Sequence, residues 1–209
     1  MTDNQENVKE IKIILLGDSG VGKTCIINRY IYNQFNPNTD TTLGSSYSSK
    51  SIKKNKIEYK LNIWDTTGQE KYHAITNLFI KGANIVILVY SIDSLSSFEG
   101  LNYWYDSIKE NLEGSNYILS IIGSKSDLIT DDEEIVSEDD ARKYAQEKNA
   151  IFKLVSSKED PGGINNLFNT LLDELIKKNI LRTNDNVVIE NKKTKKKKKC
   201  CISNNWSLK

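Results

Sequence analysis

The sequence predicts an α/β fold with three layers, in which a mainly parallel six-stranded sheet with one antiparallel edge strand carries helices on both faces. Three observations support this prediction. Short apolar runs alternate along the chain with segments of helical periodicity, as in parallel sheets. A glycine-rich loop joins the first apolar run to the first helical segment. Residues 51–64 have the pattern of a β-hairpin, which supplies the antiparallel edge.

The expected elements follow from local patterns. Ile57, Tyr59, Leu61 and Ile63 alternate with polar residues, as in a half-buried strand, and Asn55-Lys56 is a plausible hairpin turn. The other strands are near-continuous apolar runs, as expected for strands buried on both faces; they cover 11–16, 85–90, 119–123 and 152–155. Helices are expected at 25–30, 98–112, 137–149 and 164–176, the third opened by a capping box.

The glycine-rich loop is the strongest single motif. Residues 17–24 read GDSGVGKT and fit the pattern G-x-x-x-x-G-K-[ST] at every fixed position. Its glycines allow successive backbone N–H groups to face an anion, Lys23 can reach β- and γ-phosphates, and Thr24 offers a hydroxyl to Mg²⁺. The helix that follows adds its N-terminus. We therefore expect a P-loop NTPase fold whose nucleotide cradle consists of Asp18, Ser19, Gly20, Val21, Gly22, Lys23, Thr24 and Cys25.

A second group of candidate residues follows the hairpin strand. Asp65 is placed to reach Mg²⁺ through a water molecule. Gly68 can bring its backbone N–H close to a γ-phosphate because it has no Cβ. Gln69 is a neutral group that can orient a water for in-line attack, whereas a carboxylate there would be repelled by the phosphates.

A third group follows two later strands and can read the base. Asp127, in the segment Ser124–Asp127, can accept hydrogen bonds from N1–H and the N2 amino group of guanine, which adenine lacks. Ser156, Ser157 and Lys158 could close over the base. Taken alone, Ser124–Asp127 is equally compatible with an ordinary polar loop.

In combination, the segments GDSGVGKT, Thr42, WDTTGQE, SKSD and SSK resemble the Ras-superfamily small GTPases, and Trp64 before the aspartate is most similar to the Rab branch. The resemblance covers roughly residues 9–178, the expected GTPase domain. It implies a switch that binds GTP with Mg²⁺ and hydrolyses it to GDP and phosphate, slowly without an activating protein. Thr42 would coordinate Mg²⁺ and sense the γ-phosphate, Phe35 would lie against guanine, and Lys23 and Gln69 would be catalytic.

The resemblance also implies partners and a cellular role. Residues 36–47 and 66–80 would be switch loops that bind effectors, an exchange factor and a GTPase-activating protein in vesicle-mediated protein transport. Tyr47, Trp64 and Phe79 match an aromatic triad that recognises effectors in Rab proteins, although each could instead belong to the core. The residues 71–73, Lys-Tyr-His, are similar to the endocytic Rab proteins.

Three positions depart from the family pattern. Ser124 replaces the usual asparagine and loses an amide that helps to tie the base loop to the phosphate loop, so we expect weaker nucleotide retention. Thr67 and Ser157 each replace an alanine. A catalytically weak, fast-exchanging GTP-bound adaptor is therefore an alternative function. A P-loop kinase or ATPase is a third, and it would require adenine binding.

The two ends of the chain are expected to be disordered, over 1–8 and 179–209. Residues 192–199 hold seven lysines, so that a net charge of +1 leaves the rest of the chain acidic. Lysines at an anionic leaflet and lipid on Cys200 and Cys201 would anchor the chain to membranes. Rab proteins carry paired geranylgeranylated cysteines at or near the C-terminus, whereas eight residues follow Cys201 here, so prenylation, S-palmitoylation and no lipid all stay open.

The composition limits the location of the protein. No apolar segment approaches the roughly 20 residues that span a bilayer, the first residues do not form a secretory signal, and three cysteines fit a reducing cytosol. We expect the protein at the cytoplasmic face of intracellular membranes, with endosomes as one candidate, and cycling between membrane and cytosol. A lysine run can also be merely solvated, or a nuclear or RNA-binding patch; we expect no specific nucleic acid.

Overall fold

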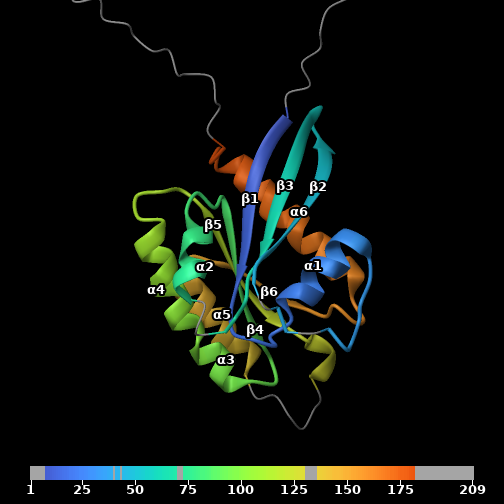
Figure 1. Cartoon of the computed structure of the whole chain (residues 1–209), viewed down its shortest axis with the longest axis vertical. Helices are drawn as coiled ribbons and strands as arrows, with labels where there is room; N and C mark the ends of the chain where they lie inside the picture. The colour runs from blue at the N-terminus through green and yellow to red at the C-terminus, as the bar shows by residue number, and fades with distance from the viewer. Residues whose placement is uncertain (1–7, 40, 43, 70–72, 130–135, 182–209) are drawn as a thin grey trace, which may run out of the picture.

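The predicted sheet is confirmed in the computed structural model, which describes residues 8–39, 41–42, 44–69, 73–129 and 136–181. Its six strands lie in the order β2-β3-β1-β4-β5-β6 (Figure 1). Only β2 and β3 pair in antiparallel fashion; the other neighbours are parallel. The strands are β1 (Val8–Leu16), β2 (Ser46–Lys54), β3 (Ile57–Asp65), β4 (Ile85–Ser91), β5 (Ile118–Ser124) and β6 (Ile151–Val155).

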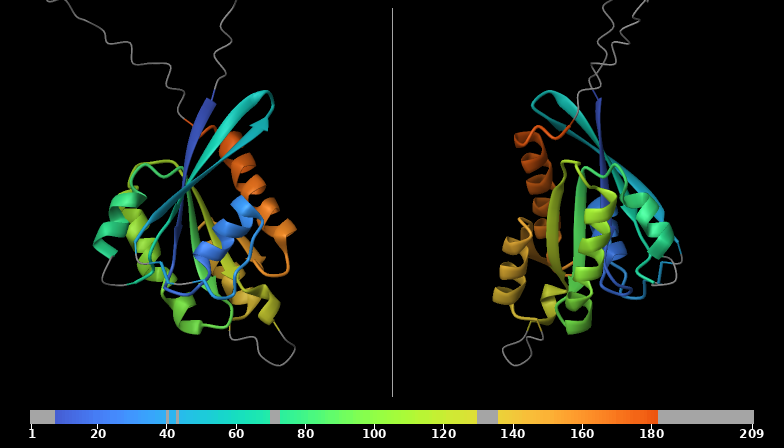
Figure 2. Two further views of the ribbon diagram at one scale, coloured as in Figure 1. Left: turned by 45° about the vertical axis from the view of Figure 1, so that its right-hand side comes forward. Right: turned by 90° about the vertical axis from the view of Figure 1, so that its left-hand side faces the viewer.

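Helices cover both faces of the sheet (Figure 2). They are α1 (Lys23–Tyr32), α2 (His73–Ile80), α3 (Leu95–Glu99), α4 (Leu101–Asn111), α5 (Glu138–Glu147) and α6 (Pro161–Lys177). The buried residues form two clusters: α1 and α6 pack on one face, and α2, α4 and α5 pack on the other. None of the helices in the described part of the chain has the length and hydropathy that a membrane span requires.

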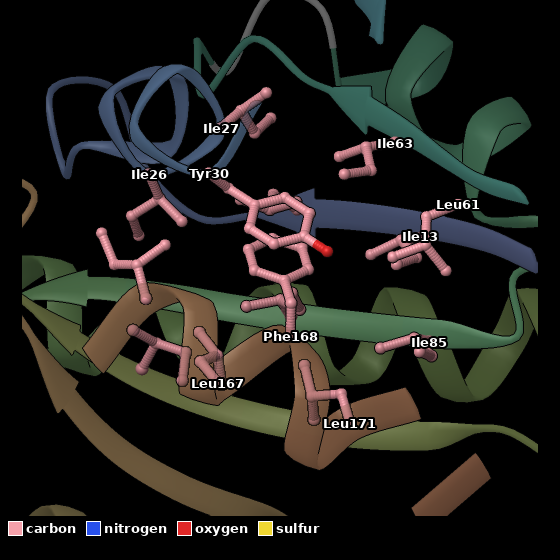
Figure 3. Close-up of a cluster of buried hydrophobic side chains, with 14 of the residues drawn as sticks. Ile13, Ile26, Ile27, Tyr30, Leu61, Ile63, Ile85, Leu167, Phe168 and Leu171 are labelled. Atoms are coloured by element: carbon pink, nitrogen blue, oxygen red, sulfur yellow. The ribbon is translucent and has the colours of Figure 1, made fainter. Parts of the chain in front are cut away.

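The first cluster fixes α1, which carries part of the candidate site. The rings of Tyr30 in α1 and Phe168 in α6 stack with centroids 3.7 Å apart, above Ile13, Ile63 and Ile85 of the sheet (Figure 3). Such a pair adds about 0.5–1.5 kcal/mol beyond the area that it buries. The helix therefore packs against both the sheet and α6.

The structure changes several predicted boundaries. β2 begins at Ser46 rather than at residue 51, because its polar residues pair through the backbone at the sheet edge and show no apolar alternation. The predicted Asn55-Lys56 turn is confirmed. The φ angle is 52° at Asn55 and 65° at Lys56, and a two-residue hairpin turn of this kind requires positive φ at both central residues. The prediction of a loop over 66–80 is wrong for its second half, because α2 begins at His73.

The helix expected at 98–112 begins earlier and is divided into α3 and α4 at Gly100. A Cβ at this position would lie 2.7 Å from a carboxylate oxygen of Asp18, so the glycine permits a close approach to the phosphate loop. The folded part is also slightly longer than 9–178: Val8 begins β1, and Ile180 and Leu181 pack against the core. Residues 1–7 and 182–209, including Cys200 and Cys201, lie outside the described residues.

The topology gathers the candidate residues at one edge of the sheet. Parallel strands end at the same edge, and α/β proteins bind ligands there. The phosphate loop follows β1, the segment 66–69 follows β3, and the two base loops follow β5 and β6.

Candidate functional site

One cavity of about 770 Å³ brings most of the predicted residues together. At one end lie the phosphate loop and the start of α1, and at the other the loops after β5 and β6. The predicted residues that line it are Ser19, Gly20, Gly22, Lys23, Thr24, Cys25, Phe35, Thr42, Gly68, Ser124, Lys125, Asp127, Ser157 and Lys158. Asp18 and Val21 line a neighbouring hollow of about 560 Å³, and Asp65 and Ser156 are buried behind the wall.

Lys23 is the buried cation of the phosphate loop. It is 5% exposed, and its Nζ donates to the carbonyl oxygens of Gly17 and Asp18, each at 2.7 Å. Burial lowers the pKa of the Lys23 ammonium to about 8, although Asp65 and Asp18 act in the opposite direction. Gly20 and Gly22, with φ of 79° and 94°, give the loop a curvature that other residues rarely adopt. The loop can therefore place a positive charge and backbone donors around an anion.

The hydroxyl groups of Thr24 and Thr42 meet the carboxylate of Asp65. Thr24 Oγ1 donates to Asp65 Oδ2 at 2.7 Å and lies 2.9 Å from Thr42 Oγ1. Asp65 Oδ1 is buried and has no hydrogen-bond partner among the described residues, and burial raises the pKa of this carboxyl group. An unsatisfied buried carboxylate oxygen is costly unless a cation or its water reaches it. Hydroxyl and carboxylate oxygens are the ligands that Mg²⁺ prefers, so these residues fit that ion.

Gly68 touches the phosphate loop directly. A Cβ on Gly68 would overlap the backbone of Asp18 and Ser19, so no larger residue fits without movement of one of the two loops. The Gln69 N–H donates to Thr67 Oγ1 at 3.3 Å, a bond that an alanine at position 67 could not make. Gln69 is half-buried and is not among the residues that line the cavity.

Asp127 is held in place by the loop that follows β6. Ser156 Oγ donates to Asp127 Oδ1 at 2.6 Å, and Lys158 Nζ lies 3.8 Å from Asp127 Oδ2. The backbone N–H groups of Lys158 and Glu159 donate to the same Ser156 hydroxyl, at 3.2 and 3.0 Å. On the other side of Asp127, Lys125 forms an ion pair with Asp93 at 3.4 Å. The aspartate therefore presents a fixed acceptor at the base end of the cavity.

Ser124 contacts the phosphate loop through its hydroxyl group in place of the amide that the family pattern has at this position. Its hydroxyl lies 2.5 Å from the Val21 carbonyl oxygen of the phosphate loop and 2.9 Å from that of Tyr90. A hydroxyl has one proton and donates to one of these acceptors at a time. The amide of the usual asparagine is absent, but the buried serine hydroxyl still reaches the phosphate loop at Val21; the weaker nucleotide retention expected from the sequence stays a prediction.

The sequence matches a family model described as Ras family over residues 12–177. The chain belongs to the Ras family. It is a small GTPase, an enzyme that binds guanine nucleotide and hydrolyses GTP.

Its relatives include proteins named as Rab proteins. The chain is 36% identical over 178 residues to the putative ras-related protein Rab-5B of Dictyostelium discoideum, covering 84% of this chain and 80% of that protein. It is 37% identical over 161 residues to the human ras-related protein Rab-22A, covering 77% and 81%. It is 35% identical over 170 residues to the ras-related protein SEC4 of Saccharomyces cerevisiae, covering 81% and 76%.

The predicted aromatic triad of this GTPase is contiguous. The Tyr47 and Trp64 rings lie 5.4 Å apart edge to face, and the Trp64 and Phe79 rings lie 5.0 Å apart. Tyr47 is 49% exposed, whereas Trp64 and Phe79 are half-buried against the core. The two predicted alternatives, surface and core, therefore both hold in part, because the row of rings runs from the core outward to Tyr47.

The sequence analysis did not identify two residues that lie at the site of this GTPase. Trp104 in α4 is buried, and its indole N–H donates to Asp18 Oδ1 at 2.9 Å. Arg29 in the last turn of α1 donates to the loop after β6. A tryptophan on the apolar face of a helix is typical of a core residue, and a basic residue is common near a helix C-terminus. Neither pattern therefore indicates a functional residue.

Proposed function

We propose that this Ras-family GTPase is a Rab-like switch that binds GTP with Mg²⁺, hydrolyses it to GDP and phosphate, and recruits effectors in vesicle trafficking. The observation that carries the proposal is the single cavity with Lys23 and Thr24 at one end and Asp127 at the other. A nucleoside triphosphate needs a cradle for its phosphates and an acceptor for guanine within one pocket.

The phosphate end would hold the charged part of the nucleotide. Lys23 and the backbone N–H groups of residues 18–25 would bind the β- and γ-phosphates. Thr24 and Thr42 would hold Mg²⁺ directly, and Asp65 would hold it through a water. This assignment is supported by the Asp65 oxygen that has no hydrogen-bond partner in the described part of the chain. The ion would supply positive charge that bridges the phosphates.

The base end would select guanine. Asp127 would accept N1–H and the N2 amino group, Lys125 would lie along the nucleotide, and Phe35 would cover the ring. Ser156, Ser157 and Lys158 would close the pocket, and the bond from Ser156 to Asp127 supports this role because it fixes the reading carboxylate.

Hydrolysis would depend on Gln69, which would orient a water for attack, while Lys23 stabilises the developing charge. No arginine is found among the described residues that line the cavity. We therefore expect slow turnover until an activating protein supplies one; Ras itself, the reference case for this chemistry, has an intrinsic rate on the order of 10⁻⁴ per second.

Residues 36–47 and 66–80 would change with the bound nucleotide and bind effectors, an exchange factor and the activating protein. Tyr47, Trp64 and Phe79 would form the effector surface, which the exposure of Tyr47 supports. The lysines of 192–199, with Cys200 and Cys201, would hold the chain at the cytoplasmic face of an intracellular membrane. The relatives named Rab-5B and Rab-22A support a Rab-type role.

A catalytically weak, fast-exchanging adaptor is the second candidate. The position of Gln69 outside the lining of the cavity favours it, as does Ser124, whose single hydroxyl replaces an amide. Single-turnover hydrolysis measured together with nucleotide release separates the two functions.

The proposed recognition of guanine by Asp127 is tested with the variant Asp127→Asn. The amide would replace one acceptor by a donor, so GDP affinity should fall by about a hundredfold or more, whereas xanthosine diphosphate, which carries a carbonyl in place of the N2 amino group, should bind. Asp106→Asn, on the exposed face of α4, is the control. If Asp127→Asn bound GDP as tightly as the unmodified chain, the proposed guanine site would be wrong.

A further inference from the structure

Arg29 connects the end of α1 and the residue that follows it with a loop about 130 residues further along the chain. From the last turn of α1, its Nε donates to the Ser157 carbonyl oxygen at 2.6 Å and its Nη2 to that of Lys158 at 3.3 Å. Its Nη1 donates to the Asn33 carbonyl oxygen at 3.0 Å and to Asn33 Oδ1 at 3.4 Å. All four acceptors are uncharged oxygens.

The first two acceptors belong to the loop that holds Asp127. Within this loop the Ser156 hydroxyl receives the N–H groups of Lys158 and Glu159 and donates to Asp127. The loop is thus a compact turn, and Arg29 holds its outer side through two consecutive carbonyl groups. Displacement of these carbonyls would move Ser156 and, with it, the carboxylate that reads the base.

The other two acceptors lie where the chain leaves α1. Asn33 ends the helix in the left-handed conformation, with φ of 53°, and its own N–H bonds to the Arg29 carbonyl oxygen. Two residues later Phe35 enters the lining of the cavity. The guanidinium therefore fixes the direction in which the segment that carries Phe35 departs.

The helix itself sets the distance between the two ends of the site. α1 begins at Lys23, and Arg29 follows six residues later, a rise of about 9 Å along the helix. Because α1 is fixed by the Tyr30–Phe168 stack, the phosphate cradle and the base loop are attached to one rigid element.

A favourable interaction with the helix dipole does not explain the contacts of Arg29. Any cation in the last turn gains that interaction, whatever it touches. The planar guanidinium instead spreads its donors over two adjacent carbonyls on one side and Asn33 on the other, which a lysine ammonium cannot match in direction.

We propose that Arg29 is a positioning residue that holds the 156–158 loop and the Phe35 segment around the bound base and thereby slows nucleotide release. The inference rests on the proposed guanine pocket. It assigns to Arg29 no contact with the nucleotide and no part in hydrolysis, which takes place at the opposite end of the cavity.

The test is nucleotide release from the full-length chain with Arg29→Gln and Arg29→Lys, loaded with a fluorescent GDP analogue and chased with excess GDP. Release should be about tenfold or more faster with Arg29→Gln, since hydrogen bonds from a charged donor are lost. The rate of GDP release from Arg29→Lys should lie between those of the unmodified chain and Arg29→Gln. Single-turnover hydrolysis of preloaded GTP should keep its rate in both variants, because Gln69 and Lys23 are untouched.

Arg142→Gln is the matched control: this arginine lies on the exposed side of α5, paired with Glu138. The inference is overturned if Arg29→Gln releases GDP at the unmodified rate, if Arg29→Lys restores retention in full so that charge alone matters, or if hydrolysis slows as much as retention weakens. Should Arg29→Gln not fold, Arg29→Lys gives the same decision. Failure of the guanine site itself would show separately, as unchanged GDP binding in Asp127→Asn.

Discussion

The two sides of the nucleotide cavity are held in different ways. The base side, which comprises Arg29, Ser124–Asp127 and Ser156–Lys158, is held by hydrogen bonds between distant parts of the chain, such as those from Ser124 to Val21 and from Arg29 to Ser157. On the sensing side, which comprises 36–47 and 66–80, Thr66 Oγ1 donates to the distant Leu15 carbonyl oxygen, but several other side-chain bonds of the described residues are local, such as that from Thr39 Oγ1 to the Asn36 carbonyl oxygen.

This difference suggests that the two sides of the cavity have different roles in nucleotide binding. Long-range bonds preform the base side, so that guanine meets a site that is already assembled. On the sensing side, Thr42 contacts the Thr24 hydroxyl; Asp65, which directly precedes the segment 66–80, has one oxygen without a hydrogen-bond partner among the described residues. Bonds that are missing there would come from the γ-phosphate and Mg²⁺, so the sensing side should respond to which nucleotide is bound.

The largest expected effect separates hydrolysis from binding. Gln69→Leu removes the group that orients the water, so single-turnover GTP hydrolysis should slow by about a hundredfold, within the usual contribution of such a group. GDP and GTP affinities should change by less than about threefold, since the base side is untouched. Gln146→Leu on the exposed face of α5 is the control. Unchanged hydrolysis in Gln69→Leu would remove the role given to Gln69.

A smaller effect is expected at Ser124. Ser124→Ala removes the tie to Val21, and GDP release should be about five- to tenfold faster, equivalent to about 1 kcal/mol. Ser120→Ala is a close control, because this buried hydroxyl of the same strand also donates to a carbonyl, that of Ile151. Both variants should lose similar stability in thermal unfolding, but only Ser124→Ala should release GDP faster. Equal rates of GDP release from Ser124→Ala and Ser120→Ala would mean that the contact of Ser124 with Val21 has no specific role.

The smallest effect is a pH dependence from Lys23. Phosphate binding favours the charged amine, whose pKa in the nucleotide-free protein is about 8. GDP affinity should therefore be constant below pH 7 and fall by about fourfold between pH 7 and 8.5. The free energy of unfolding of the nucleotide-free protein should change in the opposite direction. It should rise between pH 8 and 10.5, because there the unfolded chain binds more protons.

The pH dependence is checked by titration of GDP binding and of unfolding in denaturant. Lys23→Arg is the control, since a guanidinium stays charged throughout this range. A matching fall in affinity with Lys23→Arg would assign the titration to another group.

The site residues differ in how far the sequence alone could predict them. The cradle and the base-reading Asp127 could be predicted because they depend on short motifs with a fixed spacing. Arg29 could not, because its acceptors are backbone carbonyls of residues 157 and 158, whose position only the fold determines. The contact of the Ser124 hydroxyl with Val21 could not be predicted either, because it depends on the depth at which Ser124 is buried.

In the fold, strands buried on both faces were predicted closely because their apolar runs are continuous. β2 was predicted five residues too short, because an edge strand made of Ser, Tyr and Lys is stabilised by backbone pairing with β3. α2 was missed because the resemblance assigned 66–80 to a switch loop, which concealed the apolar content of residues 73–80.

Hydrogen exchange of the full-length chain, loaded in turn with GDP and with a non-hydrolysable GTP analogue, tests the different roles of the two sides most directly. A preformed base side predicts equal protection of 124–128 and 156–158 in the two states. A responsive sensing side predicts stronger protection of 36–47 and 66–80 with the GTP analogue. Equal protection everywhere, or a change confined to the base side, would contradict the proposed switch.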